Sequence, residues 1–176
     1  MTDPQLQQKR LTAAAIDIGI LIGFWMVMSL GMLAIGCSGI ATKVPFLGTF
    51  GVAGLALVMT IAGLCYVVGR DVLAGGRSLG KQMMGIRVVT AEGGPIGMVE
   101  SVKRNALFAP GPAMGVLLAF VMLLPGGGCI ACLLWPLRAA AVLYSLGAVV
   151  WEIIQITQKP EGVRVGDEMA GTRVVF

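Results

Sequence analysis

Long apolar stretches separated by charged segments dominate this chain. The first runs from Leu11 to Ala41 and contains one charged residue, Asp17, and the second covers about 46–68 without any charge. A helix needs about 20 residues to cross a hydrocarbon layer of about 30 Å, so each stretch is long enough to span a membrane. Because only residues 42–45 join them, the two predicted spans form an antiparallel hairpin.

The second half of the chain predicts two further spans. Apolar sequence resumes at Ala106, breaks at the turn-forming run Pro125–Gly128, and then continues with a single acid, Glu152. Pro110 and Pro112 disturb the first turns of the third span, which can therefore be short, tilted or re-entrant. We expect four transmembrane helices, at about 11–37, 46–68, 106–124 and 135–157.

Short elements are predicted between and after these spans. In the charged segment 69–105, Ser78 can cap a short helix that ends before a β-branched run. That run, Gly85–Val89, is echoed by Gly171–Val175 in the tail, 158–176. We expect the two to pair as a small β-ribbon, and chance similarity in a Val-rich chain is the alternative.

Basic residues are divided unequally between the two sides of this layout. Eleven of the 13 Lys and Arg residues fall on the side of the termini and the middle segment, and only Lys43 and Arg138 fall on the other. The positive-inside rule then places both termini in the cytoplasm. The expected fold is an all-α integral membrane protein with four transmembrane helices, a small cytoplasmic helix and a β-ribbon, in a single domain over residues 1–176.

Composition excludes a soluble or disordered chain. Of the 176 residues, 57% are apolar and 12% are charged, against about 25% charged in an ordinary soluble domain. The net charge of +4 is explained by orientation and by attraction to anionic lipid headgroups of the bilayer. Because the basic residues show no recognition-helix pattern or aromatic interleaving, we expect no nucleic-acid partner.

The sequence offers no catalytic or metal-binding motif. It has no His, which excludes His-based catalysis and the usual His ligands of zinc or haem. It also lacks a nucleophile with a base, a Walker loop and a dinucleotide fingerprint. We therefore expect neither an enzyme nor a cofactor or metal site.

Asp17 places a carboxylate inside the first predicted span. It lies six residues beyond Leu11, which is about 9 Å into the apolar region, where an unpaired carboxylate costs on the order of 2.5 to 3.5 kcal/mol. Arg10 returns to nearly the same helix face about 10 Å away, and we expect a third group between or beside the two side chains. We expect a polar cluster in the inner leaflet, built from Arg10, Asp17 and Asp167, with Lys81, Arg104 and Glu152 as further members.

Two roles are open for this cluster. Its charges can neutralise each other and only fix the helix register, as structural ion-pair networks do. Alternatively, a buried carboxylate, or one held near a base, exchanges a proton or a cation with the cytoplasm.

The cysteines suggest a second feature at the opposite side of the membrane. Cys129 and Cys132 have the spacing of redox pairs, and Cys37 is expected at a similar depth, so a disulfide among these three is possible. No thioredoxin-like pattern surrounds them. Free thiols that pack as small hydrophobic side chains are the alternative.

Several of these residues resemble the RDD family of small bacterial membrane proteins, named for one Arg and two Asp. The matching residues are Arg10 with Asp17, a Gly-Lys segment within Ser78–Val89, the pair Arg104–Asn105, and Asp167. The resemblance implies a multi-pass protein of the bacterial inner membrane, in a family for which transport, including cation/proton exchange, has been proposed. The region 108–137 is longer than in the usual three-span member.

Two functions follow as hypotheses. The first is a small transporter or cation/proton-coupled permease in which Asp17, with Arg10 and Asp167, binds the coupling ion; so few spans would require a homo-oligomer. The second is a non-transporting structural or assembly module that binds a membrane-protein partner or anionic lipid.

Overall fold

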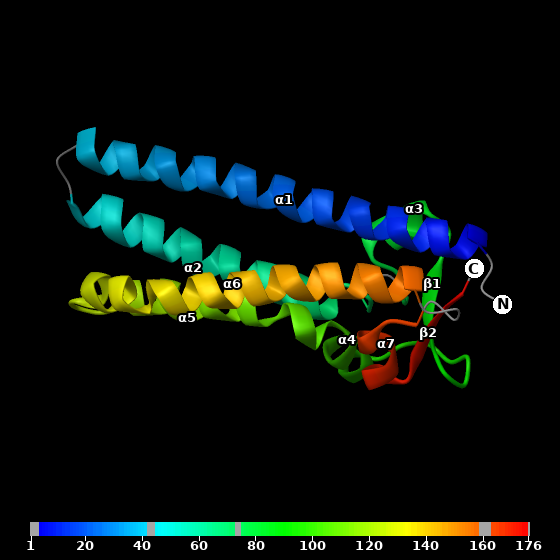
Figure 1. Ribbon diagram of the computed structural model, residues 1–176. Coiled ribbons are helices and arrows are strands. Elements are labelled where there is room, and N and C mark those ends of the chain that lie inside the picture. The colour runs from blue at the N-terminus through cyan, green and yellow to red at the C-terminus, as the bar shows by residue number, and fades with distance from the viewer. Residues whose placement is uncertain (1–3, 42–44, 73–74, 159–162, 176) are drawn as a thin grey trace. The chain divides into compact units, whose positions relative to one another are not determined.

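Three long helices form most of the protein. The computed structural model describes residues 4–41, 45–72, 75–158 and 163–175, and Figure 1 shows its long helices. These helices are apolar over most of their length. Within the part of the chain described, three helical segments are long and apolar enough to cross a membrane, at Gln5–Cys37, Phe50–Gly69 and Gly127–Gln158. The helices that contain them are α1 (Pro4–Ala41), α2 (Pro45–Gly69) and α6 (Gly127–Gln158).

The third predicted span is shorter than expected. Helix α5 covers Pro110–Met122, and its 13 residues extend only about 20 Å at the helical rise. Residues Ala106–Phe108, which were expected to begin that span, form the 3-10 helix η1 after α4 (Met98–Asn105). The chain therefore has three candidate spans among the described residues, or four if the bent pair Met98–Phe108 and Pro110–Met122 counts as one.

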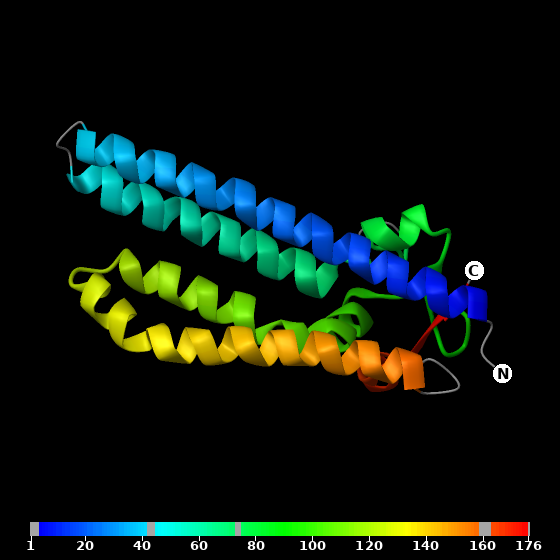
Figure 2. The same cartoon turned by 45° about the horizontal axis from the view of Figure 1, so that its top comes forward.

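The last long helix starts earlier than predicted. Helix α6 begins at Gly127, inside the run expected to form only a turn, and continues through Pro136. The turn is confined to a few residues before it, where Gly126 adopts a φ of 71°. Figure 2 shows α5 and the first half of α6 as a tight antiparallel hairpin.

The predicted β-ribbon is confirmed. Strand β1 (Arg87–Thr90) pairs antiparallel with β2 (Thr172–Val175), with Val88 opposite Val174. Two short helices precede the strands, α3 (Leu79–Met83) and α7 (Val165–Ala170). The ribbon fastens the tail to the middle segment, because residues distant in the sequence share one set of backbone hydrogen bonds.

The described contacts divide the chain into two compact units. The polar unit comprises residues 1–20, 65–109 and 145–176, and the apolar unit comprises residues 21–64 and 110–144. Every acidic residue in the described part of the chain belongs to the polar unit. Its small apolar core lies under the ribbon and consists of Ala13, Ile86, Val88, Ile96 and Val174.

Candidate functional site: a buried charge cluster

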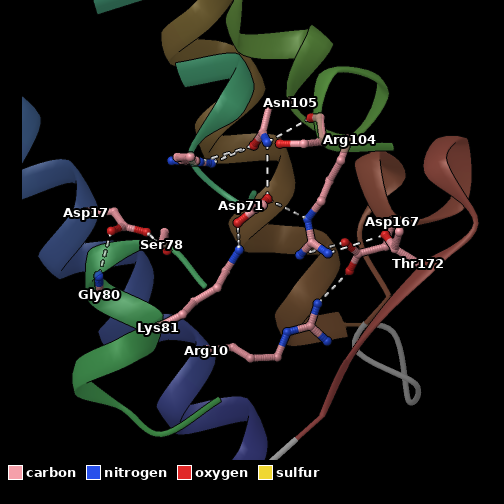
Figure 3. A network of polar contacts seen from close by, with 12 residues as sticks. Arg10, Asp17, Asp71, Ser78, Gly80, Lys81, Arg104, Asn105, Asp167 and Thr172 are labelled. Carbon is pink, nitrogen blue, oxygen red and sulfur yellow. Dashed lines mark hydrogen bonds and ion pairs between the residues drawn. The ribbon is translucent and has the colours of Figure 1, made fainter. Parts of the chain in front are cut away.

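Asp71 is the first centre of a charge cluster in the polar unit. It follows the end of α2 and is fully buried. Lys81 Nζ donates a hydrogen bond to Asp71 Oδ1, and Asn105 Nδ2 donates one to Oδ2 at 3.1 Å (Figure 3). Arg104 Nε lies 3.2 Å from the same Oδ2 atom. The carboxylate thus accepts hydrogen bonds from Lys81 of α3 (Leu79–Met83) and from Asn105 of α4 (Met98–Asn105).

Asp167 is the second centre. It lies in the first turn of α7, is 1% exposed, and accepts a hydrogen bond from the backbone N–H of Arg164. Arg10 Nη2 lies 2.6 Å from Oδ2, Arg104 Nη2 lies 2.9 Å from Oδ1, and Arg164 Nη2 lies 3.5 Å from Oδ1. Three guanidinium groups from α1, α4 and the tail therefore share one carboxylate.

Arg104 joins the two centres. Its buried guanidinium contacts Asp71 on one side and Asp167 on the other, and Nη1 donates a hydrogen bond to Thr172 Oγ1 at 3.3 Å (Figure 3). Helix α4 makes this possible because its polar face, including Ser101 and Arg104, points into the unit. Helix α4 is therefore amphipathic, with its polar face inward.

The C-terminal part of α6 is connected to the same cluster through Glu152. Arg164 Nη1 donates a hydrogen bond to Glu152 Oε2 at 2.7 Å, and both side chains are buried. Arg164 also approaches Asp167, so Glu152 is connected to the second centre through one guanidinium.

Asp17 is held separately from its expected partner Arg10. Ser78 Oγ donates a hydrogen bond to Asp17 Oδ2 at 2.5 Å, and the backbone N–H of Gly80 donates one to Oδ1 at 2.8 Å. Gly80 allows this approach because a Cβ atom there would lie 2.2 Å from the carbonyl oxygen of Ala13. The carboxylate of α1 thus anchors α3, while Arg10 extends to Asp167.

The structure therefore unites most of the predicted members and adds others. Arg10, Lys81, Arg104, Glu152 and Asp167 belong to one connected cluster. Four further members were not predicted for it: Arg70, Asp71, Asn105 and Arg164. The only sequence signal for Asp71 is its position directly after an apolar span, where a charged side chain can lie at the membrane boundary.

Arg70 extends the cluster toward η1. Its Nη2 donates to Asn105 Oδ1 at 2.9 Å, and its Cζ lies 5.6 Å from the centre of the Phe108 ring. Asn105 therefore links Arg70 to Asp71 by accepting at its oxygen and donating from its nitrogen.

Among the described contacts, this connected cluster holds more positive than negative charge. Its bases are Arg10, Arg70, Lys81, Arg104 and Arg164, and its acids are Asp71, Glu152 and Asp167. An excess of cations in a buried site favours the release of a proton, and arginine keeps its charge under all ordinary conditions. Lysine is the one base of the set that can lose a proton near neutral pH.

The pKa values of Lys81 and Asp71 follow from this balance. Burial, reinforced by the charge of Arg104, lowers the pKa of Lys81 to about 7, although Asp71 acts in the opposite direction. Burial alone would raise the pKa of Asp71, but the charges of Lys81 and Arg104 outweigh it and hold that pKa far below its ordinary range. Asp71 therefore stays ionised, while the protonated form of Lys81 is disfavoured relative to a free lysine.

Metal ligation and a disulfide find no support in the described parts of the chain. In those parts, no group of three or more His, Cys, Asp or Glu residues is arranged to hold a metal ion. Cys37, Cys65, Cys129 and Cys132 are exposed free thiols in the structure. The disulfide among Cys37, Cys129 and Cys132 stays a prediction.

Comparison with known proteins gives one match. The model of the RDD family matches residues 7–142. This range contains Arg10, Asp17, Asp71, Lys81 and Arg104 and ends before α7. No curated protein and no solved structure matches the chain.

Proposed function

The chain belongs to the RDD family of small membrane proteins, and from that premise we propose that it is a proton-coupled permease in which Lys81 exchanges the coupling proton. The observation that carries the proposal is the cluster of five bases and three acids, in which Lys81 is the base able to release a proton near neutral pH. Ionised Asp71 accepts the hydrogen bond of the protonated amine. Loss of the proton reduces the positive excess of the cluster by one charge.

The same excess argues for a proton and against a metal cation as the coupling ion. A cation entering the cluster would meet net repulsion from five basic groups, and its carboxylates already have basic partners. We therefore replace the earlier expectation of ion binding at Asp17 with proton exchange at Lys81. Asp17 is assigned the role of anchoring α3 through Ser78 and Gly80.

Transport also requires a water-accessible path across the bilayer. Three or four spans enclose little interior, so the proposal includes a homo-oligomer whose subunits together line that path. Its location is the inner membrane of a bacterium. We place the polar unit on the cytoplasmic side, because its sequence ranges contain 11 of the 13 Lys and Arg residues.

A second candidate is a non-transporting assembly module that binds a membrane-protein partner or lipid. It is favoured by the way the cluster joins four helices and the tail: Arg104 connects Asp71 to Asp167, and Arg164 connects Asp167 to Glu152. Under this alternative, the charges stabilise the polar unit and no proton moves.

Proton flux in proteoliposomes separates the two candidates. Vesicles containing the full chain and a trapped pH-sensitive dye would be given a pH gradient, with the membrane potential held constant by a potassium ionophore. We expect flux above that of empty vesicles, and its loss in Lys81→Arg, which keeps the charge but cannot release a proton near neutral pH. Lys103→Arg, at an exposed position of α4, is the matched control and should retain flux.

Absence of flux in the wild type, with a folded protein, would reject a pathway in which Lys81 exchanges its proton across the membrane. Full flux in Lys81→Arg would reject Lys81 as the site of proton exchange, but not the permease itself. A protease-resistant tail, and a melting temperature equal to that of the wild type below about pH 6, where both side chains are charged, would show that the Lys81→Arg variant is folded.

A further inference from the structure

The apolar unit contains positive charge without any acidic residue. Residues 21–64 and 110–144 include Lys43 and Arg138 but no Asp or Glu. Arg138 lies within α6, and an arginine inside a membrane span requires a counter-charge or contact with water. We propose that Arg138 binds the phosphate group of an anionic phospholipid. This site is separate from the charge cluster and independent of the proposed transport.

The neighbours of Arg138 that the structure describes are uncharged. Its Cζ lies 5.9 Å from the centre of the Trp135 ring. A Cβ atom at Gly115 would lie 3.5 Å from Arg138 Nη1 and 3.1 Å from Thr60 Cγ2, so the guanidinium lies beside α5 and Gly115 packs closely against Thr60. The hydroxyl of Thr60 donates to the Ala56 carbonyl oxygen of its own helix at 2.8 Å. These neighbours position the guanidinium, and residues 21–64 and 110–144 contain no carboxylate that could pair with it.

The position of Arg138 along α6 brings it within reach of the membrane surface. Arg138 and Glu152 are 14 residues apart, which is about 21 Å along the helix, whereas the hydrocarbon layer is about 30 Å thick. With Glu152 at or inside one boundary, Arg138 lies within about 9 Å of the other in an upright helix. A long arginine side chain can extend from that depth to the headgroup level.

The side chains next to Arg138 favour a lipid as the source of the phosphate. Trp135 is 64% exposed, and tryptophan is enriched at the boundary between hydrocarbon and headgroups. Leu133 and Leu137 are also exposed, at 81% and 53%, and would contact acyl chains beside the headgroup. A guanidinium matches a phosphate with two parallel hydrogen bonds. An anionic phospholipid fits best because a zwitterionic one already balances its phosphate with its own cation.

Native mass spectrometry and thermal melting of the full chain in mild detergent test this proposal. The probes are phosphatidylglycerol, phosphatidylcholine and inorganic phosphate, each added separately. We expect phosphatidylglycerol to bind more tightly than phosphatidylcholine and to raise the melting temperature. In Arg138→Gln the affinity for phosphatidylglycerol should fall about tenfold or more, as for the loss of a charge-assisted hydrogen-bonded pair.

The matched control is Arg87→Gln, which removes the same charge from an exposed position of the ribbon and should bind phosphatidylglycerol as the wild type does. Arg138→Lys keeps the charge but loses the planar fork, and should bind with intermediate affinity. Equal binding by Arg138→Gln and the wild type would overturn the proposal. Stabilisation by inorganic phosphate as strong as that by the lipid would overturn the lipid as its source.

Discussion

The guanidinium of Arg104 lies 2.9 Å from the carboxylate of Asp167, and both side chains are 1% exposed. This ion pair joins α4 to the tail helix α7, and the other side of Arg104 reaches Asp71 at the end of α2. Such a buried pair has little net effect on stability while it is intact, because desolvation offsets much of the attraction. Removal of one partner is costly, since the remaining charge stays buried.

We expect Arg104→Gln to be among the most destabilising substitutions in the polar unit. It leaves Asp71 and Asp167 with fewer cationic partners, and breaking a buried pair in this way costs about 3–5 kcal/mol. The measurement is the free energy of unfolding in detergent, together with the protease resistance of the tail. Lys103→Gln, the exposed neighbour, should change neither. A stable Arg104→Gln variant with a protected tail would show that the cluster does not hold α7 in place.

Ser78→Ala tests the anchoring of α3 by Asp17. The substitution removes the hydroxyl that donates to Asp17 Oδ2, and an unsatisfied buried acceptor costs about 1–3 kcal/mol. Thr157→Ala is the control, because that exposed hydroxyl donates only within its own helix in the contacts described. Equal melting temperatures for the two variants would contradict the anchoring role.

Gly80→Ala tests the close packing of α3 against α1. The added Cβ would lie 2.2 Å from the carbonyl oxygen of Ala13, so the backbones must separate, at a cost of about 1–3 kcal/mol. Gly147→Ala provides a matched control, because a Cβ there meets no atom within 4 Å and alanine favours a helix. Thermal melting should show a loss for the first variant and no loss for the second; an unchanged Gly80→Ala protein would contradict the packing.

The stability of the protein should rise between about pH 7 and pH 10 because of Lys81. Burial and Arg104 lower the pKa of Lys81 to about 7 in the folded protein, against about 10.4 for a free lysine, so the unfolded chain binds more protons over this range. The slope attributable to this residue is at most about 1.4 kcal/mol per pH unit.

Melting temperatures at several pH values measure this effect. The rise of stability with pH should be absent below about pH 6, where Lys81 is protonated in both the folded and the unfolded state. Lys81→Arg should remove the rise at higher pH. A wild-type profile that is flat from pH 7 to 10, or a rise that persists in Lys81→Arg, would contradict the assignment.

The sequence by itself determined the membrane-spanning character, the ribbon and the location of the charge. Apolar length decides whether a helix can cross a bilayer, and it identified three long spans from local sequence alone. The repeated Val-rich run identified β1 and β2 because strand pairing depends on a pattern that each segment carries by itself. The third span was misjudged at its start, because apolar content does not distinguish η1 from the beginning of α5.

Only the tertiary structure decided which charges meet. Arg10 and Asp17 were expected on one helix face with a third group between or beside them, but Arg10 pairs with Asp167 of the tail, and Asp17 receives neutral donors from Ser78 and Gly80. The sequence cannot give these partners, because an ion pair depends on where long, flexible side chains from separate segments converge. Asp71 was missed for the same reason. The excess of bases over acids, from which the role of Lys81 follows, exists only after the fold has brought those residues together.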